Sequence, residues 1–223
     1  MRVLVFGGSG TIGSEVSSEL SARGIEVVTV SNSSPSADIQ TQKGFEPLLD
    51  LKVKFDGCVW AQGINSNDTL NTSDNFEDVL NSNLVYIVKS LRFMLDNHLL
   101  EASSSLVVVS SVWQNITRKK KFSYTVSKAA IEGLVNSVMA DFSIIGMRIN
   151  AVLPGVVDSK MTRENLTSSQ ISKIESETPN NTLVTAQELA KVISWLLSDE
   201  SKGINGQFIT VDNGWSNVRT LWN

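Results

Sequence analysis

Three residues in the middle of the chain have the types and the spacing of a proton-transfer site. Tyr124 and Lys128 are four residues apart, and Ser111 stands 13 positions before the tyrosine. If the tyrosine and the lysine share a helix, positions i and i+4 lie on one face, and the ammonium would favour ionisation of the phenol. A phenol titrates near pH ~10, so work near neutrality needs a pKa shift of roughly three units, about 4 kcal/mol at 1.36 kcal/mol per unit. The pair indicates a general acid or base, although a Tyr-x-x-x-Lys match also arises by chance.

The elements that must position these residues follow a regular order, in which short apolar runs alternate with helical patterns. Strands are predicted at residues 2–6, 26–30, 58–60, 106–110, 148–153 and 207–211, and helices at 12–22, 76–97, 124–144 and 186–198. Runs that are apolar on both faces are typical of a parallel sheet buried between helices. We therefore predict an α/β fold in one domain, residues 1–223, with a doubly wound parallel sheet and helices on both faces.

Composition and charge exclude several classes of function. Of the 223 residues, 41% are hydrophobic, which suffices for the core of one domain. A net charge of −4 offers no basic field for nucleic acid or for an anionic membrane. Cys58, the single cysteine, lies in an apolar run and fits a reducing compartment, while His98, the single histidine, supports no metal site. The N-terminus lacks the apolar stretch of a signal peptide, so we expect a cytoplasmic protein.

A glycine-rich turn, Gly7-Gly8-Ser9-Gly10-Thr11-Ile12-Gly13, follows the first predicted strand directly. Glycines let the backbone approach a pyrophosphate, and the N-terminus of the next helix offers free N–H groups and the positive end of its dipole. A tight turn without a ligand is the alternative, but the place between the first strand and the first helix favours dinucleotide binding. The predicted contacts are Gly7, Ser9, Gly10, Thr11, Ile12 and Gly13.

Further motifs occur in the order of one family. The turn matches Gly-x-x-x-Gly-x-Gly at Gly7 and Gly13, with Thr11 in place of the middle glycine. Other matches are Asp38, Asn83, the pair Ser110-Ser111, and the segments 150–159 and 205–214. With these features the chain resembles, over nearly its whole length, the compact single-domain branch of the short-chain dehydrogenase/reductase family, and is similar to its 3-oxoacyl-carrier-protein reductase-like members.

This resemblance implies a Rossmann-type fold and hydride transfer between a nicotinamide and a secondary alcohol or ketone. It makes Tyr124 the general acid or base, lets Ser111 bind the substrate oxygen, and lets Lys128 hold the ribose hydroxyls while acidifying the phenol. Asn83 is expected to anchor a water for proton relay. The resemblance also implies a homodimer or homotetramer. It assigns to the cofactor Asp38, near the adenine, and Pro154, Gly155, Val157 and Ser159, beside the nicotinamide.

One motif departs from the family's pattern. The family has Asn-Asn-Ala-Gly after the fourth strand, whereas this chain has Trp60-Ala61-Gln62-Gly63. Ala61, Gln62 and Gly63 are still expected to line the cofactor ribose, with Gln62 in place of the asparagine contacts. Ser31, Asn32 and Ser33 follow the second strand, where an acidic residue would bind the 2′-hydroxyl of NAD. No acidic residue stands there, which removes a charge that would repel a 2′-phosphate. No arginine or lysine is present to bind that phosphate either, so NADP(H) is favoured over NAD(H) only by a small margin.

The sequence says less about the substrate than about the cofactor. The basic run Arg118-Lys119-Lys120-Lys121 lies between Ser111 and Tyr124, where it could attract an anionic small-molecule substrate or an acidic acyl carrier protein. A solvated loop is the commoner explanation for such a run. Trp113 either lines the pocket or packs in the core. The polar segment 159–182 is expected to form a lid over a polar substrate.

Two other functions remain open for the same fold. A nucleotide-sensing or scaffold protein would bind the cofactor without catalysis, which the altered motif at residues 60–63 favours a little. The intact Ser111, Tyr124 and Lys128 argue against it. An epimerase acting on a nucleotide sugar would use the same tyrosine and lysine, but it would need a second domain for which the chain has little room.

Overall fold

A parallel sheet of seven strands, in the order β3-β2-β1-β4-β5-β6-β7, forms the centre of the protein. The computed structural model describes residues 1–32, 34, 36–42 and 44–218, so the predicted contact Ser33 lies outside the described residues. The strands are β1 (Arg2–Phe6), β2 (Glu26–Ser31), β3 (Ile39–Gln40), β4 (Phe55–Trp60), β5 (Leu100–Val109), β6 (Arg148–Pro154) and β7 (Phe208–Val211). The helices are α1 (Thr11–Ala22), α2 (Phe76–Leu80), α3 (Tyr86–Asp96), α4 (Phe122–Phe142), α5 (Lys160–Asn165), α6 (Ser168–Glu177) and α7 (Ala186–Leu197).

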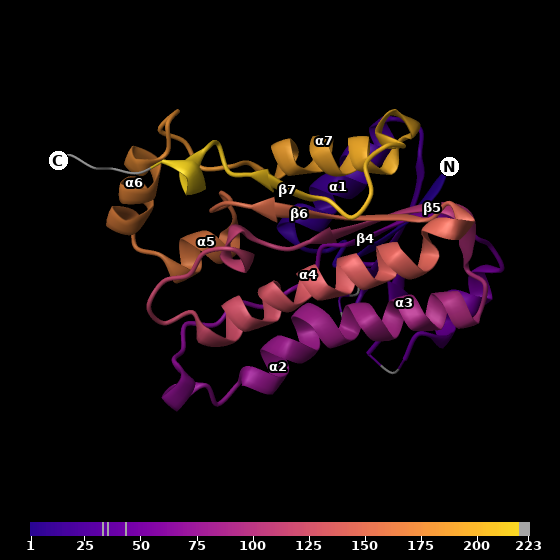
Figure 1. Cartoon of the computed structure of the whole chain (residues 1–223), viewed down its shortest axis with the longest axis horizontal. Helices are drawn as coiled ribbons and strands as arrows, with labels where there is room; N and C mark the ends of the chain where they lie inside the picture. Colours follow the sequence, from indigo (N-terminus) through magenta and orange to yellow (C-terminus); the bar gives the residue numbers. More distant parts are fainter. Residues whose placement is uncertain (33, 35, 43, 219–223) are drawn as a thin grey trace.

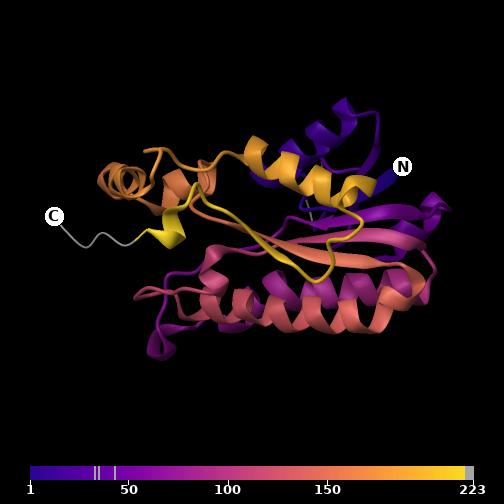
Figure 2. The ribbon, with the colours of Figure 1, turned by 45° about the horizontal axis from the view of Figure 1, so that its top comes forward.

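The sheet is buried on both faces, as the apolar runs predict. In β1 the side chains of Val3 and Val5 enter one core, and those of Leu4 and Phe6 enter the other. Helices α1 and α7 cover the first face, while α3 and α4 cover the second (Figures 1 and 2). Within the described part of the chain, no helix is both long and apolar enough to cross a membrane.

The carboxyl ends of the parallel strands all meet at one edge of the sheet. Helices α5 and α6 lie beyond this edge, apart from the layers that cover the sheet (Figure 1). In doubly wound sheets ligands bind outside the carboxyl ends of the strands. The architecture confirms the predicted fold class, a Rossmann-type doubly wound sheet in a single domain.

Three local features differ from the sequence prediction. Strand β3 was not predicted, because a strand of two residues, Ile39 and Gln40, is too short to show an alternating pattern of apolar and polar residues. Strand β5 begins at Leu100, ahead of the predicted start at 106, through a polar stretch that pairs with β4. The predicted helix 76–97 contains one turn of π-helix, Asn81–Val85, between α2 and α3. Single π turns often occur at functional sites, and this one carries Asn83.

Candidate active site

A cavity of about 930 Å³ opens at the carboxyl edge of the sheet and brings the predicted site residues together. All of the predicted catalytic and cofactor-binding residues that the structure describes line it, except Gly13, Asp38 and Asn83. These residues come from the turns after β1, β2, β4, β5 and β6 and from the first turns of α4, elements distant in the sequence. If the motifs belong to one active site, their residues must meet in space, and in this cavity they do.

The glycine turn after β1 leaves no room for side chains at Gly7 and Gly13. A Cβ on Gly13 would lie 2.1 Å from the Gly7 carbonyl oxygen, and a Cβ on Gly7, whose φ is +75°, would lie 2.6 Å from the Gln62 backbone nitrogen. Gly13 therefore supports the turn from inside α1 although it does not line the cavity. With Gly10 as the N-cap of α1, the turn presents backbone to the cavity, an arrangement that suits a pyrophosphate.

Gln62 bears on whether a dinucleotide cofactor fits this cavity. Its Oε1 and Nε2 atoms are both buried, and neither has a hydrogen-bond partner among the described residues, although the residue lines the cavity. An unpaired buried amide is costly. A ligand with hydroxyl groups in the cavity would satisfy it, and the glycine turn leaves space for that ligand's phosphates. The residues present thus fit a nicotinamide dinucleotide, and Gln62 stands where the usual asparagine contacts would be.

Ser111 and Tyr124 form the reactive pair of the site. Ser111 follows β5, is 5% exposed, and its hydroxyl lies near enough to the phenol of Tyr124 to lower the pKa of that phenol. The same Oγ accepts a hydrogen bond from the backbone N–H of Trp113 at 3.3 Å, which fixes the hydroxyl at the strand end. Tyr124 stands in the first turn of α4 and is half-buried. A substrate oxygen at this point of the cavity would meet both hydroxyl groups.

Lys128 lies one turn further along α4, on the same face as Tyr124. It is 3% exposed, its Nζ donates a hydrogen bond of 2.9 Å to the Val109 carbonyl, and it lies 5.8 Å from the centroid of the Tyr124 ring. Burial lowers the pKa of Lys128 to about 8. The i, i+4 spacing thus does place the two side chains together, as predicted.

The pKa of Tyr124 corrects the electrostatic part of that prediction. Burial raises the phenol's pKa above its ordinary value, and the nearby Ser111 hydroxyl lowers it only in part. The Lys128 ammonium is directed at the Val109 carbonyl and lies against the ring, so desolvation outweighs its influence. The expected depression of the phenol's pKa by Lys128 is therefore wrong for this structure.

Asn83 is placed behind the site and not in its wall. From the π turn its Nδ2 donates to the Ile64 carbonyl and to Ser127 Oγ, both at 3.0 Å, and its Oδ1 accepts from the Ile64 N–H at 2.8 Å. A Cβ on Gly63 would lie 3.0 Å from the same Oδ1. Asn83 therefore holds the backbone after β4 against α4, and these side-chain contacts leave no free N–H for the expected water.

Asp38 does not face the cavity. Its carboxylate accepts hydrogen bonds from the N–H and the hydroxyl of Thr29 in β2, at 2.7 and 2.8 Å. The residue precedes β3 rather than following the third strand, and these bonds turn its side chain away from the predicted adenine contact.

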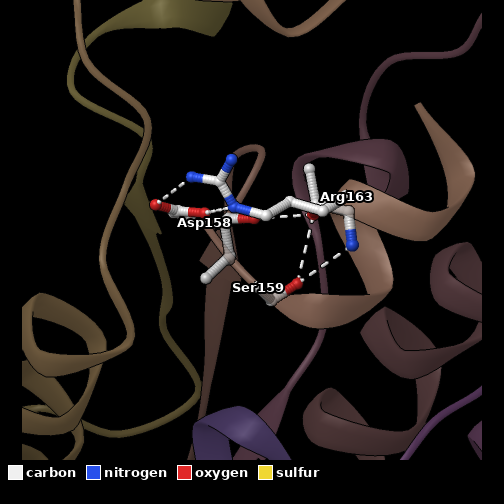
Figure 3. Close-up of polar contacts among 5 residues, drawn as sticks. Asp158, Ser159 and Arg163 are labelled. Atoms are coloured by element: carbon white, nitrogen blue, oxygen red, sulfur yellow. Dashed lines mark hydrogen bonds and ion pairs between the residues drawn. The ribbon is translucent and has the colours of Figure 1, made fainter. Parts of the chain in front are cut away.

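The predicted lid begins where β6 ends and contains α5 and α6, both of which contribute to the cavity wall. Ser159 is the N-cap of α5, and its Oγ accepts from the N–H of Thr162 at 3.2 Å. Arg163 reaches back to Asp158 with two contacts of 2.9 Å, as Figure 3 shows. These contacts hold the first turn of α5 against the residues that precede it, and so fix which side of α5 faces the cavity.

Lys121 and Trp215 are among the residues of the cavity wall that sequence reasoning missed. A solvated loop would leave Lys121 exposed, yet it is 4% exposed and lines the cavity, whereas Lys119 and Lys120 are exposed as expected. Trp215, in the short helix that follows β7, lines the cavity and packs edge-on against Trp113 at 5.8 Å between centroids. Neither could be found from local pattern, because partners distant in the sequence determine both positions.

Comparison with known proteins identifies the family. Residues 36–216 match the family model described as enoyl-(acyl carrier protein) reductase. The uncharacterized oxidoreductase YmfI of Bacillus subtilis is 26% identical over 236 residues, which cover 95% of this chain and 97% of that protein. The 3-oxoacyl-[acyl-carrier-protein] reductase FabG of Buchnera aphidicola subsp. Schizaphis graminum is 26% identical over 233 residues, which cover 95% of each protein.

A solved structure agrees over nearly the whole chain. The short chain dehydrogenase family protein of Francisella tularensis superposes with a TM-score of 0.86 at 26% identity, covering 97% of this chain and 99% of that one. The match thus includes both the glycine turn and the strand that ends the sheet. The protein belongs to the short-chain dehydrogenase/reductase family and is an NAD(P)-dependent oxidoreductase.

Proposed function

We propose that this oxidoreductase interconverts a secondary alcohol and a ketone with Tyr124 as general acid and base. The observation that carries the proposal is that Ser111, Tyr124 and Lys128 meet in the wall of one cavity, with the Lys128 ammonium 5.8 Å from the centroid of the Tyr124 ring. A non-catalytic sensor is not favoured, because the serine, the tyrosine and Lys128 converge there and the relatives are named oxidoreductases.

The chain's own residues provide the proton and the charge stabilisation for such a reaction. In reduction, Tyr124 donates its phenolic proton to the alkoxide that develops on the substrate, and in oxidation it accepts that proton. The Ser111 hydroxyl donates a hydrogen bond to the same oxygen where negative charge develops. The Lys128 ammonium, 5.8 Å from the ring centroid, would bind the ribose hydroxyls of the cofactor beside the phenol.

The cofactor would be held along the carboxyl edge of the sheet. The glycine turn and the N-terminus of α1 would bind the pyrophosphate, Gln62 and Lys128 the ribose next to the nicotinamide, and Ser31 and Asn32 the adenosine ribose. When bound, the nicotinamide supplies the hydride in reduction or accepts it in oxidation. Asn83 positions Ile64, which lines the cavity beside the Gly63 backbone.

NADP(H) is proposed as the preferred cofactor over NAD(H), by a small margin. Ser31 and Asn32 line the cavity at the end of β2, and Ser31 Oγ accepts a hydrogen bond of 3.4 Å from Ser9. The nearby carboxylate of Asp38 is bonded to Thr29 and does not line the cavity, so no charge repels a 2′-phosphate from that side.

A panel of ketones tests the proposal, with oxidation of NADPH and of NADH followed by absorbance. The panel should include 3-oxoacyl thioesters, since the Buchnera relative is named for such a substrate. We expect turnover of at least one ketone, with a higher kcat/KM for NADPH than for NADH. If no ketone is reduced although both nucleotides bind, or if NADH is preferred, the corresponding part of the proposal is wrong.

A further inference from the structure

Two residues of the basic run between Ser111 and Tyr124 face the cavity, and two do not. Arg118 and Lys121 line the cavity, while Lys119 and Lys120 are exposed outside it. A solvated basic loop would expose all four side chains alike, but Lys121 is buried while Arg118, Lys119 and Lys120 are exposed. The burial of Lys121 at the cavity therefore needs its own explanation.

Lys121 is a buried cation held by neutral groups. It is 4% exposed, and its Nζ donates to Asn65 Oδ1 and, at 3.2 Å, to the Ser66 carbonyl. An ammonium has three N–H donors, so one remains for the cavity. Burying a cation without an anionic partner is costly, and that burial lowers the pKa of Lys121 to about 8.

The acidic residue beside Lys121 is engaged elsewhere. The carboxylate of Asp68 accepts hydrogen bonds from the Ser123 N–H and from Ser66 Oγ, both at 2.9 Å. Among the described residues, no ion pair includes Lys121 or Arg118. Neither cation therefore forms an ion pair with a carboxylate among the described residues, although Asp68 lies near enough to raise the pKa of Lys121 against the larger effect of burial.

Arg118 is oriented by its neighbours. Its guanidinium carbon lies 5.9 Å from the centroid of the Trp113 ring, and one guanidinium nitrogen donates to Asn67 Oδ1 at 3.2 Å. Trp113 in turn packs edge-on against Trp215. A guanidinium offers five N–H donors in a planar fork that suits carboxylate and phosphate. With one more bond to the Lys119 carbonyl at 3.2 Å, donors remain for a ligand.

The pair stands next to the reacting group. Lys121 Nζ lies 5.2 Å from the centroid of the Tyr124 ring, which is as close as Lys128 at 5.8 Å. The other charged residues in the cavity wall are Asp78 on α2 and, on α6, Lys173 and Glu177, which pair with each other at 3.9 Å. An anion held by Lys121 would therefore lie only a few bonds from the carbon that reacts beside Tyr124.

We propose that Lys121 and Arg118 form an oxyanion-binding subsite that selects ketones and alcohols carrying a carboxylate or a phosphate near the reacting carbon. The proposal rests on the proposed function, because it specifies the substrate class of the same cavity. It explains why a lysine is buried beside Tyr124 without an acidic partner. Small anionic substrates would complete its hydrogen bonds, and Trp113 would cover them from the side of Arg118.

The test compares binding of matched ligands to the protein in the presence of saturating NADP⁺, which has no hydride to transfer to a ketone. Acetoacetate is paired with its neutral methyl ester, and dihydroxyacetone phosphate with dihydroxyacetone, so that the two pairs distinguish a carboxylate from a phosphate. Dissociation constants are measured by ligand-observed NMR or calorimetry for the wild type, Lys121→Met and Arg118→Gln. Lys119→Met, which removes an exposed charge of the same run, is the matched control.

We expect the wild type to bind at least one anion about tenfold more tightly than its neutral partner, the effect of about one charge-assisted hydrogen bond. That preference should fall to about one in Lys121→Met, should fall in part in Arg118→Gln, and should persist in Lys119→Met. If Lys121→Met fails to fold, the anion preference of Arg118→Gln still tests the subsite, because Arg118 is exposed and its replacement should not disturb folding. A wild type without anion preference, including one that binds neither anion, overturns the subsite, as does an equal loss in Lys119→Met. Binding is measured without turnover, so a failure of the proposed oxidoreduction would appear separately, as NADPH that no ketone oxidises.

Discussion

The ammonium nitrogen of Lys128 lies 5.8 Å from the centroid of the Tyr124 ring and donates its hydrogen bond to the Val109 carbonyl, 2.9 Å away. The lysine charge thus lies near the aromatic ring, while the nearby Ser111 hydroxyl lowers the pKa of the phenol. Roles that the sequence assigned to one lysine are therefore divided between two groups. Ser111 lowers the pKa of the phenol, and Lys128 supplies a buried positive charge beside it.

Ser111→Ala should change both the rate and the pH profile of the reaction. Loss of the hydroxyl removes a donor to the substrate oxygen, so we expect kcat to fall by about 10²-fold. It also removes the group that lowers the pKa of Tyr124, so the rise of the oxidation rate with pH should move to higher pH. Ser110→Ala is the control, because Ser110 Oγ donates to Gln114 at 2.8 Å. A profile that moves equally in both variants would contradict this role.

Gln62→Met should stabilise the protein alone and weaken its binding of cofactor. The replacement removes a buried amide whose two polar atoms have no partner among the described residues, worth about 1–3 kcal/mol in the free energy of unfolding. The dissociation constant for NADPH should rise. Gln114→Met is the matched control and should destabilise, since the Gln114 amide is paired with Ser110. Urea unfolding and nucleotide titration measure both effects, and a destabilised Gln62→Met would refute the prediction.

Gly13→Ala and Gly133→Ala should have opposite effects on stability. A Cβ at Gly13 would meet the Gly7 carbonyl oxygen at 2.1 Å, so the turn must shift at a cost of about 1–3 kcal/mol, and cofactor affinity should fall with it. A Cβ at Gly133, exposed on α4, meets nothing within 4 Å and should stabilise by about 0.5–1 kcal/mol. Urea unfolding measures the free energy of unfolding of both variants. Changes of equal size and the same sign would contradict the geometry of the two sites.

Lys128→Met should reveal the cost of burying the ammonium as a function of pH. The ordinary pKa of 10.5 applies to the unfolded chain, and burial lowers the pKa to about 8 in the folded protein. Below pH 8 both states hold the proton, and the buried charge opposes folding by roughly 3 kcal/mol at 1.36 kcal/mol per unit. Between pH 8 and 10.5 the folded state releases the proton first, so the wild type gains stability relative to the variant.

The measurement is the difference in unfolding free energy between Lys128→Met and the wild type from pH 7 to 10. Lys121 has a similarly lowered pKa but is present in both proteins, so its contribution cancels. The advantage of the methionine variant should shrink as the pH rises through 8. A difference that stays constant over this range would show that Lys128 titrates alike in both states.

Much of the fold follows from the sequence because the strands are buried on both faces. The apolar runs gave six of the seven strands, including β1, whose residues Val3 to Phe6 enter two cores in alternation. Strand β3 was not predicted because two residues, Ile39 and Gln40, are too few to show a periodic pattern of apolar residues. The site motifs were visible for a different reason: glycines at a turn and a tyrosine one helical turn before a lysine are constraints of local geometry.

Properties that depend on distant partners could not be predicted. Lys119 and Lys121 are equivalent in sequence, yet Lys121 is buried because Asn65 and Ser66, from the loop after β4, accept its hydrogen bonds. Asp38 faces Thr29 for a similar reason. The sign of the Tyr124 pKa shift likewise depends on burial by the folded chain, which spacing alone does not reveal.

The most direct test of the account is the single-turnover rate of NADPH oxidation by Tyr124→Phe with the best ketone of the panel. Loss of the phenolic proton donor should slow this step by about 10²–10⁴-fold, while the dissociation constant for NADPH stays within about twofold of the wild-type value. A variant that binds NADPH normally and transfers hydride at the wild-type rate would contradict the assignment of Tyr124 as the general acid.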